Sequence, residues 1–229
     1  MMVDMTENHL HSRFHHVGHR HDYMPAARHD ALLPAYDLLT RVFGFATVYQ
    51  TLIGQAELTE GHRVLEIGSG TGNLTIRAKR SASGVEAIGI DPDPLALSRA
   101  QRKSHGMTGI RFDRGYAQKL PYADGEFDRV LSSMMLHHLD SEAKTAAAGE
   151  VFRVLRPGGS VHVVDIDAEV AENDGRLARF FARRRHAAAH FGEPIPQLLS
   201  DAGFDCAVLA TRRRPVIGRL TFFSATRPA

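Results

Sequence analysis

One stretch decides the fold of this chain: Val64-Leu65-Glu66-Ile67-Gly68-Ser69-Gly70-Thr71-Gly72-Asn73. Its apolar start predicts a buried strand, and the glycines at alternate positions predict a tight turn that leads into a helix. Glycine accepts positive φ and has no Cβ, so the backbone of such a turn can lie directly against a ligand. The first N–H groups of the helix add free hydrogen-bond donors. The stretch therefore predicts a strand, turn and helix that bind a flat or extended molecule.

An acidic residue follows at the end of the next predicted strand, Ile88-Gly89-Ile90-Asp91. Asp91 lies about 20 residues beyond the glycines, the spacing at which an acid at the end of a second strand meets ribose hydroxyls. A carboxylate accepts both protons of a vicinal diol, and its charge strengthens these hydrogen bonds. The glycine turn and Asp91 together predict a cofactor that contains adenosine.

The spacing of the glycines indicates which cofactor. The turn reads G-x-G-x-G, and Asn73 stands where the dinucleotide fingerprint G-x-G-x-x-G has its last glycine. The carboxylate of Glu66 beside the turn favours a ligand with an ammonium group and disfavours a pyrophosphate. This favours S-adenosylmethionine over NAD. An NAD-dependent oxidoreductase is the alternative, although the chain has no Tyr-x-x-x-Lys pair; a protein that binds the cofactor without catalysis is another.

Over the centre of the chain, short apolar runs alternate with helical patterns. The runs occupy 64–67, 85–90, 110–112, 127–131 and 160–165, and helical patterns fit 72–80, 94–104 and 141–155. Such alternation predicts a parallel sheet covered on both faces, with ligands at the carboxyl ends of its strands. A helix over 194–202 and strands at 204–209 and 220–224 follow, and the last connection is too short for a crossover. We expect an α/β fold: a Rossmann-like, doubly wound, mostly parallel seven-stranded sheet with an antiparallel last strand and helical lid elements.

The chain divides into three parts. Residues 1–30 hold seven histidines and few aliphatic residues, so we expect a flexible arm. These histidines lack the carboxylates and second anchoring element of a dedicated metal site, and we expect no metal. We expect residues 31–58 to form N-terminal helices on the side where a second substrate, the acceptor, would bind. We expect residues 59–229 to form the cofactor-binding domain, with a helical insertion at 169–192.

The composition narrows the class of protein further. The formal net charge of +2 gives no overall signature of nucleic-acid binding, and the arginine runs at 183–185 and 212–214 are expected to be solvated. The alternative is that the first run attracts an acidic acceptor or an RNA backbone. The single cysteine, Cys206, excludes an internal disulfide and a cysteine zinc cluster. No apolar run fits a secretory signal or a membrane span, so we expect a cytoplasmic protein. No pattern indicates an oligomeric state.

These features together resemble the class I S-adenosylmethionine-dependent methyltransferases, and most closely the small-molecule branch that includes the ubiquinone and menaquinone biosynthesis methyltransferases. The resemblance covers roughly residues 60–226. Besides the glycine stretch, the motifs that carry it, in the order of the family, are Gly89-Ile90-Asp91, Leu120-Pro121-Tyr122, Phe127-Asp128-Arg129-Val130, His137-His138-Leu139, Arg153-Val154-Leu155-Arg156-Pro157-Gly158-Gly159 and Ala202-Gly203-Phe204.

The resemblance implies a set of cofactor-binding residues: Glu66, Gly68, Ser69, Gly70, Gly72, Asp91, Pro92, Tyr116, Ala117, Ser132 and Ser133. Glu66 and the turn would face the methionine part, Asp91 the ribose, and Pro92 the adenine. Segment 115–117 would contact the adenine edge, and the two serines would lie near the sulfonium. The family often has an acid at the position of Tyr116, which accepts a hydrogen bond from the adenine amino group. In this chain the N–H of Ala117 would serve the adenine ring, and Tyr116 would stack on it or form a hydrogen bond through its hydroxyl.

Transfer from a sulfonium is an in-line displacement, so the protein mainly aligns the reactants and excludes water. His137 and His138 follow the fourth strand and are the candidates for a general base, needed only if the acceptor must lose a proton. The alternative is that one packs and the other caps the loop. Met134 and Met135 could pack on an apolar acceptor. No Asn-Pro-Pro-Tyr-like tetrad follows this strand, which argues against methylation of base amino groups and favours a small-molecule acceptor.

Overall fold

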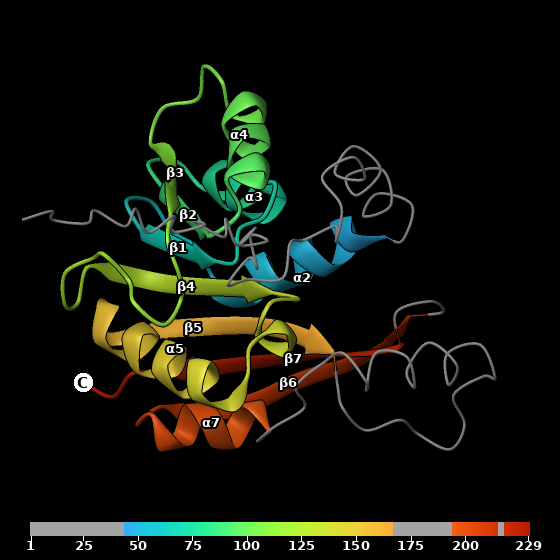
Figure 1. Ribbon diagram of the computed structural model, residues 1–229, viewed down its shortest axis with the longest axis vertical. Helices are drawn as coiled ribbons and strands as arrows, with labels where there is room; N and C mark the ends of the chain where they lie inside the picture. Colours follow the sequence, from blue (N-terminus) through green and yellow to red (C-terminus); the bar gives the residue numbers. More distant parts are fainter. Residues whose placement is uncertain (1–43, 167–193, 215–217) are drawn as a thin grey trace, which may run out of the picture.

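The computed structural model describes residues 44–166, 194–214 and 218–229, which form one mixed sheet between two layers of helices (Figure 1). The strands are β1 (Arg63–Ile67), β2 (Glu86–Asp91), β3 (Ile110–Arg114), β4 (Phe127–Ser133), β5 (Leu155–Ile166), β6 (Asp205–Arg214) and β7 (Gly218–Thr226). The helices are α2 (Phe45–Ala56), α3 (Asn73–Ser81), α4 (Pro94–Lys103), α5 (Ser141–Val154), α7 (Ile195–Asp201) and the 3-10 turn η2 (Leu136–His138).

The order of the strands places the site. The seven strands follow the order β3-β2-β1-β4-β5-β7-β6. The pairs from β3 to β5 are parallel, and β7 runs antiparallel to both β5 and β6. The expected fold class is therefore confirmed, including the antiparallel last strand. The chain builds the sheet outward from β1 to β3 and then returns to place β4 on the other side of β1, so the carboxyl ends of β1 and β4 form the topological switch point where such sheets bind ligands.

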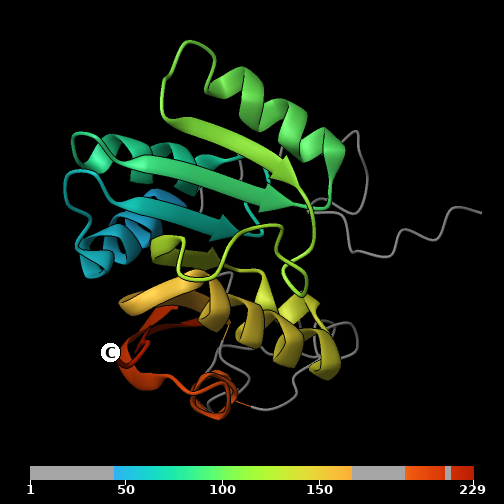
Figure 2. The same cartoon turned by 90° about the vertical axis from the view of Figure 1, so that its left-hand side faces the viewer.

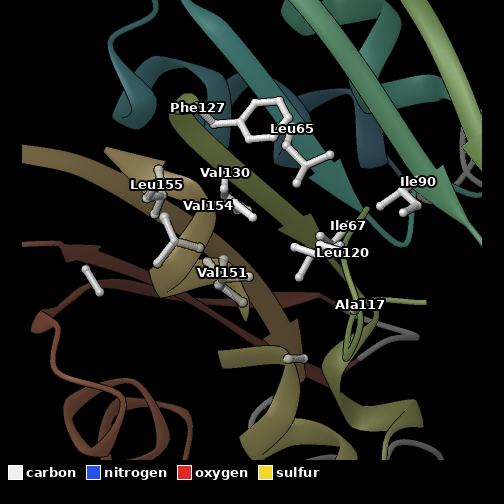
Figure 3. Close-up of a cluster of buried hydrophobic side chains, with 14 of the residues drawn as sticks. Leu65, Ile67, Ile90, Ala117, Leu120, Phe127, Val130, Val151, Val154 and Leu155 are labelled. Carbon is white, nitrogen blue, oxygen red and sulfur yellow. The ribbon is translucent and has the colours of Figure 1, made fainter. Parts of the chain in front are cut away.

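Alternation along the strands divides the core between the two faces. Leu65 and Ile67 of β1 point to one face, where Figure 3 shows the strand side chains lying against Val151 and Val154 of α5. Val64 points to the other face and joins a second cluster with residues of α2 and α3. Figure 2 shows these two layers from the side. Each fully buried aliphatic side chain contributes roughly 1.5–3 kcal/mol, so both layers hold the sheet rigidly.

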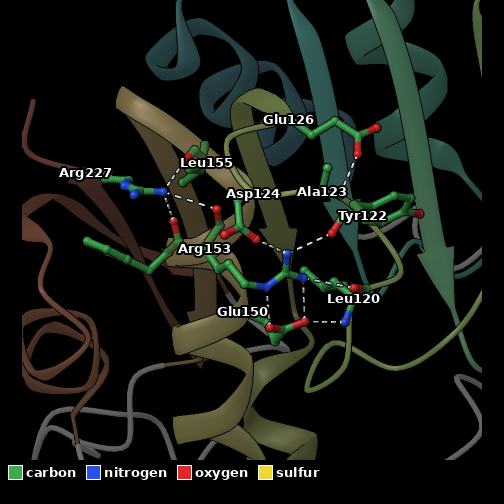
Figure 4. Close-up of polar contacts among 10 residues, drawn as sticks. Leu120, Tyr122, Ala123, Asp124, Glu126, Glu150, Arg153, Leu155 and Arg227 are labelled. Atoms are coloured by element: carbon green, nitrogen blue, oxygen red, sulfur yellow. Dashed lines mark hydrogen bonds and ion pairs between the residues drawn. The ribbon is translucent and has the colours of Figure 1, made fainter.

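A polar network fixes the segment between β3 and β4 (Figure 4). The guanidinium of Arg153 on α5 donates to the carbonyl oxygens of Leu120 at 3.0 Å and Tyr122 at 2.8 Å, and to the carboxylate of Glu150. Glu150 in turn accepts the N–H of Leu120 at 2.6 Å. The motif around Leu120 therefore anchors the chain that follows β3 to the C-terminal end of α5, beside the start of β5.

Two expected parts fall outside the described residues: the arm at 1–30 and the insertion at 169–192. Of the expected N-terminal helices, α2 is described, and it begins after Gly44, which has a φ of 70°. Its Val48 and Leu52 pack into the core beneath β4 and β5. Among the described helices, none is long and apolar enough to cross a membrane.

Candidate cofactor site and family

The three glycines of the turn all adopt the left-handed conformation, with φ of 70° at Gly68, 49° at Gly70 and 77° at Gly72. Their surroundings differ. A Cβ at Gly68 would overlap the side chain of Met135, and one at Gly72 would come within 2.7 Å of the Phe112 ring, whereas one at Gly70 would point into open space. The open side of the turn is therefore at Gly70, and Gly72 is required for packing between α3 and its neighbours.

The end of β2 holds the turn in place. The N–H groups of Gly68 and Ser69 donate to the carbonyl oxygen of Ile90 at 2.9 and 3.0 Å. The N–H of Gly70 donates to Oδ2 of Asp91 at 2.7 Å, and the N–H of Asp93 donates to Oδ1 at 2.9 Å. These bonds connect the two sequence features that predicted the site.

Asp91 is suited to hold a diol. It is 8% exposed, and burial raises the pKa of its carboxyl while the two N–H bonds act in the opposite direction. Each carboxylate oxygen accepts one backbone N–H and retains further acceptor capacity. The carboxylate is thus held in a fixed orientation beside the open side of the turn.

Glu66 lies beneath the turn and is 3% exposed. It forms a hydrogen bond with the hydroxyl of Thr75 on α3. Burial raises the pKa of Glu66 to about 8; the Thr75 bond and the charge of Lys103 oppose this shift, and the charge of Asp91 adds to it. Burial therefore favours the neutral carboxyl, and a cation placed beside it would favour the ionised form.

Three buried hydroxyls lie at the same edge of the sheet. The Oγ atoms of Ser69, Ser132 and Ser133 are buried and have no hydrogen-bond partner among the described residues. Buried polar atoms are nearly always hydrogen-bonded, so a group of exceptions indicates a place for a polar ligand. The orphaned hydroxyls, the open face of Gly70 and the fixed carboxylate of Asp91 together fit the cofactor that the sequence predicts.

The remaining predicted cofactor contacts follow β2 and β3. Pro92 comes directly after Asp91 and is half-buried, and the N–H of Gly115 donates to the carbonyl oxygen of Asp91 at 3.2 Å. Tyr116 forms an isolated bridge with Lys119. Ala117 is buried against the core cluster on the α5 side. The structure thus brings the segments that follow β1, β2, β3 and β4 to one edge.

His137 has a partner that the sequence analysis missed. Its Nδ1 lies 2.5 Å from Oδ1 of Asp165, and its backbone N–H donates to Oδ2 at 3.3 Å. Asp165 is 1% exposed, near the end of β5. The ring of His138 lies 4.0 Å from that of His137, centroid to centroid. The sequence signal for Asp165 was an acid near the end of a strand, the same signal that identified Asp91.

A cavity of about 700 Å³ lies elsewhere, along α3 and between α2 and α4. Arg77, Arg80 and Lys103 contribute cations to its lining, and Asn73 lies at one end. None of the strand-end serines or Asp91 lines it. Within the described ranges, no group of three or more histidine, cysteine, aspartate or glutamate residues could hold a metal ion.

Comparison with known sequences identifies relatives that match about two thirds of the chain. A model of a methyltransferase domain matches residues 64–159. A demethylmenaquinone methyltransferase of Thermus thermophilus is 31% identical over 158 residues, which are 67% of this chain and 70% of the relative. An uncharacterised protein of Mycobacterium tuberculosis is 33% identical over 152 residues. That match covers 66% of this chain, and the chain spans only about half (54%) of the relative's length.

Solved structures agree with this match. A possible histamine N-methyltransferase of Thermotoga maritima superposes with a TM-score of 0.65 at 23% identity, over 86% of this chain and 97% of its own. The phosphoethanolamine N-methyltransferase 2 of Haemonchus contortus, solved with S-adenosylmethionine, superposes with a TM-score of 0.69 at 16% identity, over 89% of this chain and 58% of its own. Below 25% identity, the solved structures show only that the fold is shared. Membership of the family rests on the sequence relatives. With its glycine turn, its Asp91 and these relatives, the chain belongs to the class I S-adenosylmethionine-dependent methyltransferases.

Proposed function

We propose that this protein transfers the methyl group of S-adenosylmethionine to a small-molecule acceptor. The observation that carries the proposal is the arrangement at the switch point of the sheet. There the open face of Gly70, the fixed carboxylate of Asp91 and the unpartnered hydroxyls of Ser69, Ser132 and Ser133 lie at one edge.

Each of these residues has a task in holding the cofactor. Asp91 would accept hydrogen bonds from the ribose hydroxyls, and Glu66 would ionise to pair with the ammonium group. Pro92, Tyr116 and Ala117 would lie beside the adenine. Of the glycines, Gly70 would approach the cofactor, whereas Gly72 serves the packing of α3.

The bound cofactor supplies a methyl group on a sulfonium, which is already activated for transfer. The residues of the chain have to hold the acceptor in line with that group and exclude water. His137 and His138 lie in η2, after β4, and would accept a proton if the acceptor must lose one.

The acceptor that we propose is a small, largely apolar molecule, with quinols the first class to test. Two relatives support this choice, the demethylmenaquinone methyltransferase of Thermus thermophilus and a ubiquinone/menaquinone biosynthesis C-methyltransferase of Pasteurella multocida, 28% identical over 201 residues. The side chain of Met135 lies against Gly68 and offers an adaptable apolar surface beside the turn.

Turnover tests the proposal. The protein is incubated with S-adenosylmethionine and a panel of quinols, phenols and amines, and S-adenosylhomocysteine and methylated product are measured by mass spectrometry. Asp91→Ala is the negative control, and Asp205→Ala, an exposed residue at the start of β6, is the matched variant. Stoichiometric product that depends on Asp91 supports the proposal. Binding of S-adenosylhomocysteine with no transfer to any acceptor would instead assign the alternative of a cofactor-binding protein.

A further inference from the structure

We infer that His137 and Asp165 act as a proton-accepting pair in which Asp165 is the positioning residue and Nε2 of His137 takes a proton from the acceptor. The inference rests on the proposed function and narrows the class of acceptor. An acceptor that needs this pair carries an O–H or N–H whose proton leaves during methyl transfer.

The contact between the two side chains fixes the tautomer of the imidazole. Oδ1 of Asp165 lies 2.5 Å from Nδ1 of His137 and also accepts the N–H of Ile166 at 2.7 Å. An ionised carboxylate can only accept hydrogen bonds, so the hydrogen of the neutral ring must lie on Nδ1. The lone pair of the ring is therefore on Nε2, the nitrogen that does not face Asp165.

The carboxylate also fixes where the ring lies. Oδ2 of Asp165 accepts the backbone N–H of His137 at 3.3 Å, so a single side chain holds both the ring and the main chain. Asp165 is 1% exposed and the side chain of His137 is 12% exposed. A buried carboxylate that orients a slightly exposed imidazole is the arrangement that a general base requires.

The backbone before His137 is shaped to bring it to this place. Met134 has a φ of 57°, a left-handed conformation that is strained for a residue other than glycine, and its N–H donates to the carbonyl oxygen of Val164 at 2.9 Å. The next residue, Met135, packs its side chain against Gly68 of the cofactor turn. The same sharp bend therefore places one residue on the glycine turn and, two residues later, His137 on the end of β5.

Other charged groups face the pair from α5 and from η2. Lys144 is buried, and its pKa is lowered by burial, while the charges of Asp165 and Asp140 oppose that shift. The ring of His138 lies against that of His137. A charged imidazole at His137 thus meets a carboxylate on one side and a second imidazole on another.

In the proposed step, the methyl group and a proton leave in different directions. A lone pair of the acceptor oxygen or nitrogen forms the bond to the methyl carbon as the sulfur–methyl bond breaks, and that bond's electron pair stays on sulfur. The acceptor's O–H or N–H proton passes to Nε2 of His137, and the resulting imidazolium is stabilised by Asp165. The proton then leaves to water. Hydroxyl compounds, quinols and amines that bind in their neutral form satisfy this chemistry.

The tautomer can be measured without any acceptor. Long-range ¹H–¹⁵N NMR spectra of histidine-labelled protein distinguish a hydrogen on Nδ1 from one on Nε2, and His137→Gln assigns the signal among the 14 histidines of the chain. We expect the Nδ1–H form in the wild type and a shift toward the Nε2–H form in Asp165→Asn. Asp201→Asn, an exposed residue of α7, is the matched control. A wild-type ring with its hydrogen on Nε2 would overturn the inference.

The second test measures steady-state kinetics with reduced 1,4-naphthoquinone as the probe acceptor. Asp165→Asn and His137→Gln should each lower kcat at least about 100-fold, with the KM for the quinol and the affinity for S-adenosylhomocysteine changed less than about threefold. An unchanged kcat in Asp165→Asn would overturn the pair. Failure of the wild type to bind S-adenosylhomocysteine would reject the proposed function instead, and the NMR result would still decide the geometry of the pair.

Discussion

Replacing Glu66 with Gln should stabilise the protein without cofactor and weaken its binding of the cofactor. The Glu66 carboxyl is buried beneath the glycine turn, and burial raises its pKa to about 8. Its ordinary pKa, which the unfolded chain would show, is 4.5. A raised pKa in the folded state means that the contribution of this group to stability is complete below pH 4.5 and is lost as the pH rises toward 8.

The magnitude follows from the two pKa values. Each pH unit between them changes the free energy of unfolding by about 1.36 kcal/mol, so Glu66 destabilises the wild type by roughly 3 kcal/mol at pH 7. Glutamine has nearly the same shape and no charge, and it avoids this penalty. The expected gain in Glu66→Gln is therefore roughly 3 kcal/mol at pH 7 and close to zero at pH 4.5.

Urea unfolding of the protein without cofactor at pH 4.5, 6, 7 and 8 measures this difference. Glu60→Gln, a substitution at an exposed position, is the matched control and should change stability by less than about 0.5 kcal/mol at every pH. Calorimetry should show S-adenosylhomocysteine binding about tenfold or more weaker in Glu66→Gln, because the ammonium loses its charged partner. A stability difference that does not vary with pH would refute the reasoning.

Three further predictions concern the frame of the site. Burial, with the charge of Arg129 adding to it, lowers the pKa of His162 to about 4; the stability from its neutral ring is lost as the pH falls below 6.5, by about 2 kcal/mol at pH 5. Urea unfolding at pH 7 and 5 should show that His162→Gln removes this loss, and an equal pH slope in both proteins would count against it. Gly72→Ala should lower stability by roughly 2–4 kcal/mol, because a methyl group there meets Phe112 at positive φ, whereas Gly70→Ala should cost only about 1 kcal/mol; similar thermal midpoints for the two variants would contradict this. Arg153→Met should lower the free energy of unfolding by on the order of 2 kcal/mol and speed proteolysis between β3 and β4, since two carbonyl oxygens lose their donor; unchanged cleavage there would argue that other contacts hold the segment.

The features that the sequence predicted well are local ones. Glycines at 68, 70 and 72 act through their own φ angles, and Asp91 acts from the end of its own strand, so both follow from the order of residues. The seven strands follow from short apolar runs, and the antiparallel pairing of β6 and β7 follows from a connection too short to cross over. The boundary between α5 and β5 was less exact. The strand begins at Leu155, whereas its apolar run becomes visible only at residue 160.

The features that could not be predicted from the sequence depend on contacts between segments that are distant in the chain. Asp165 meets His137 because β5 lies beside β4, and 28 residues separate the two in the chain. The packing task of Gly72 depends on Phe112, which comes from β3. No periodicity or spacing encodes these meetings, because they depend on the register between strands and on the way helices pack on them.

Calorimetric titration of S-adenosylhomocysteine into the folded protein tests the central claim most directly. The wild type should bind one equivalent with saturable heat, and Asp91→Asn, shown by circular dichroism to be folded, should bind at least about tenfold more weakly because the charged acceptor for the ribose hydroxyls is lost. A folded wild type that gives no heat, or an Asp91→Asn variant that binds as tightly as the wild type, would contradict the assignment of this edge of the sheet as the cofactor site.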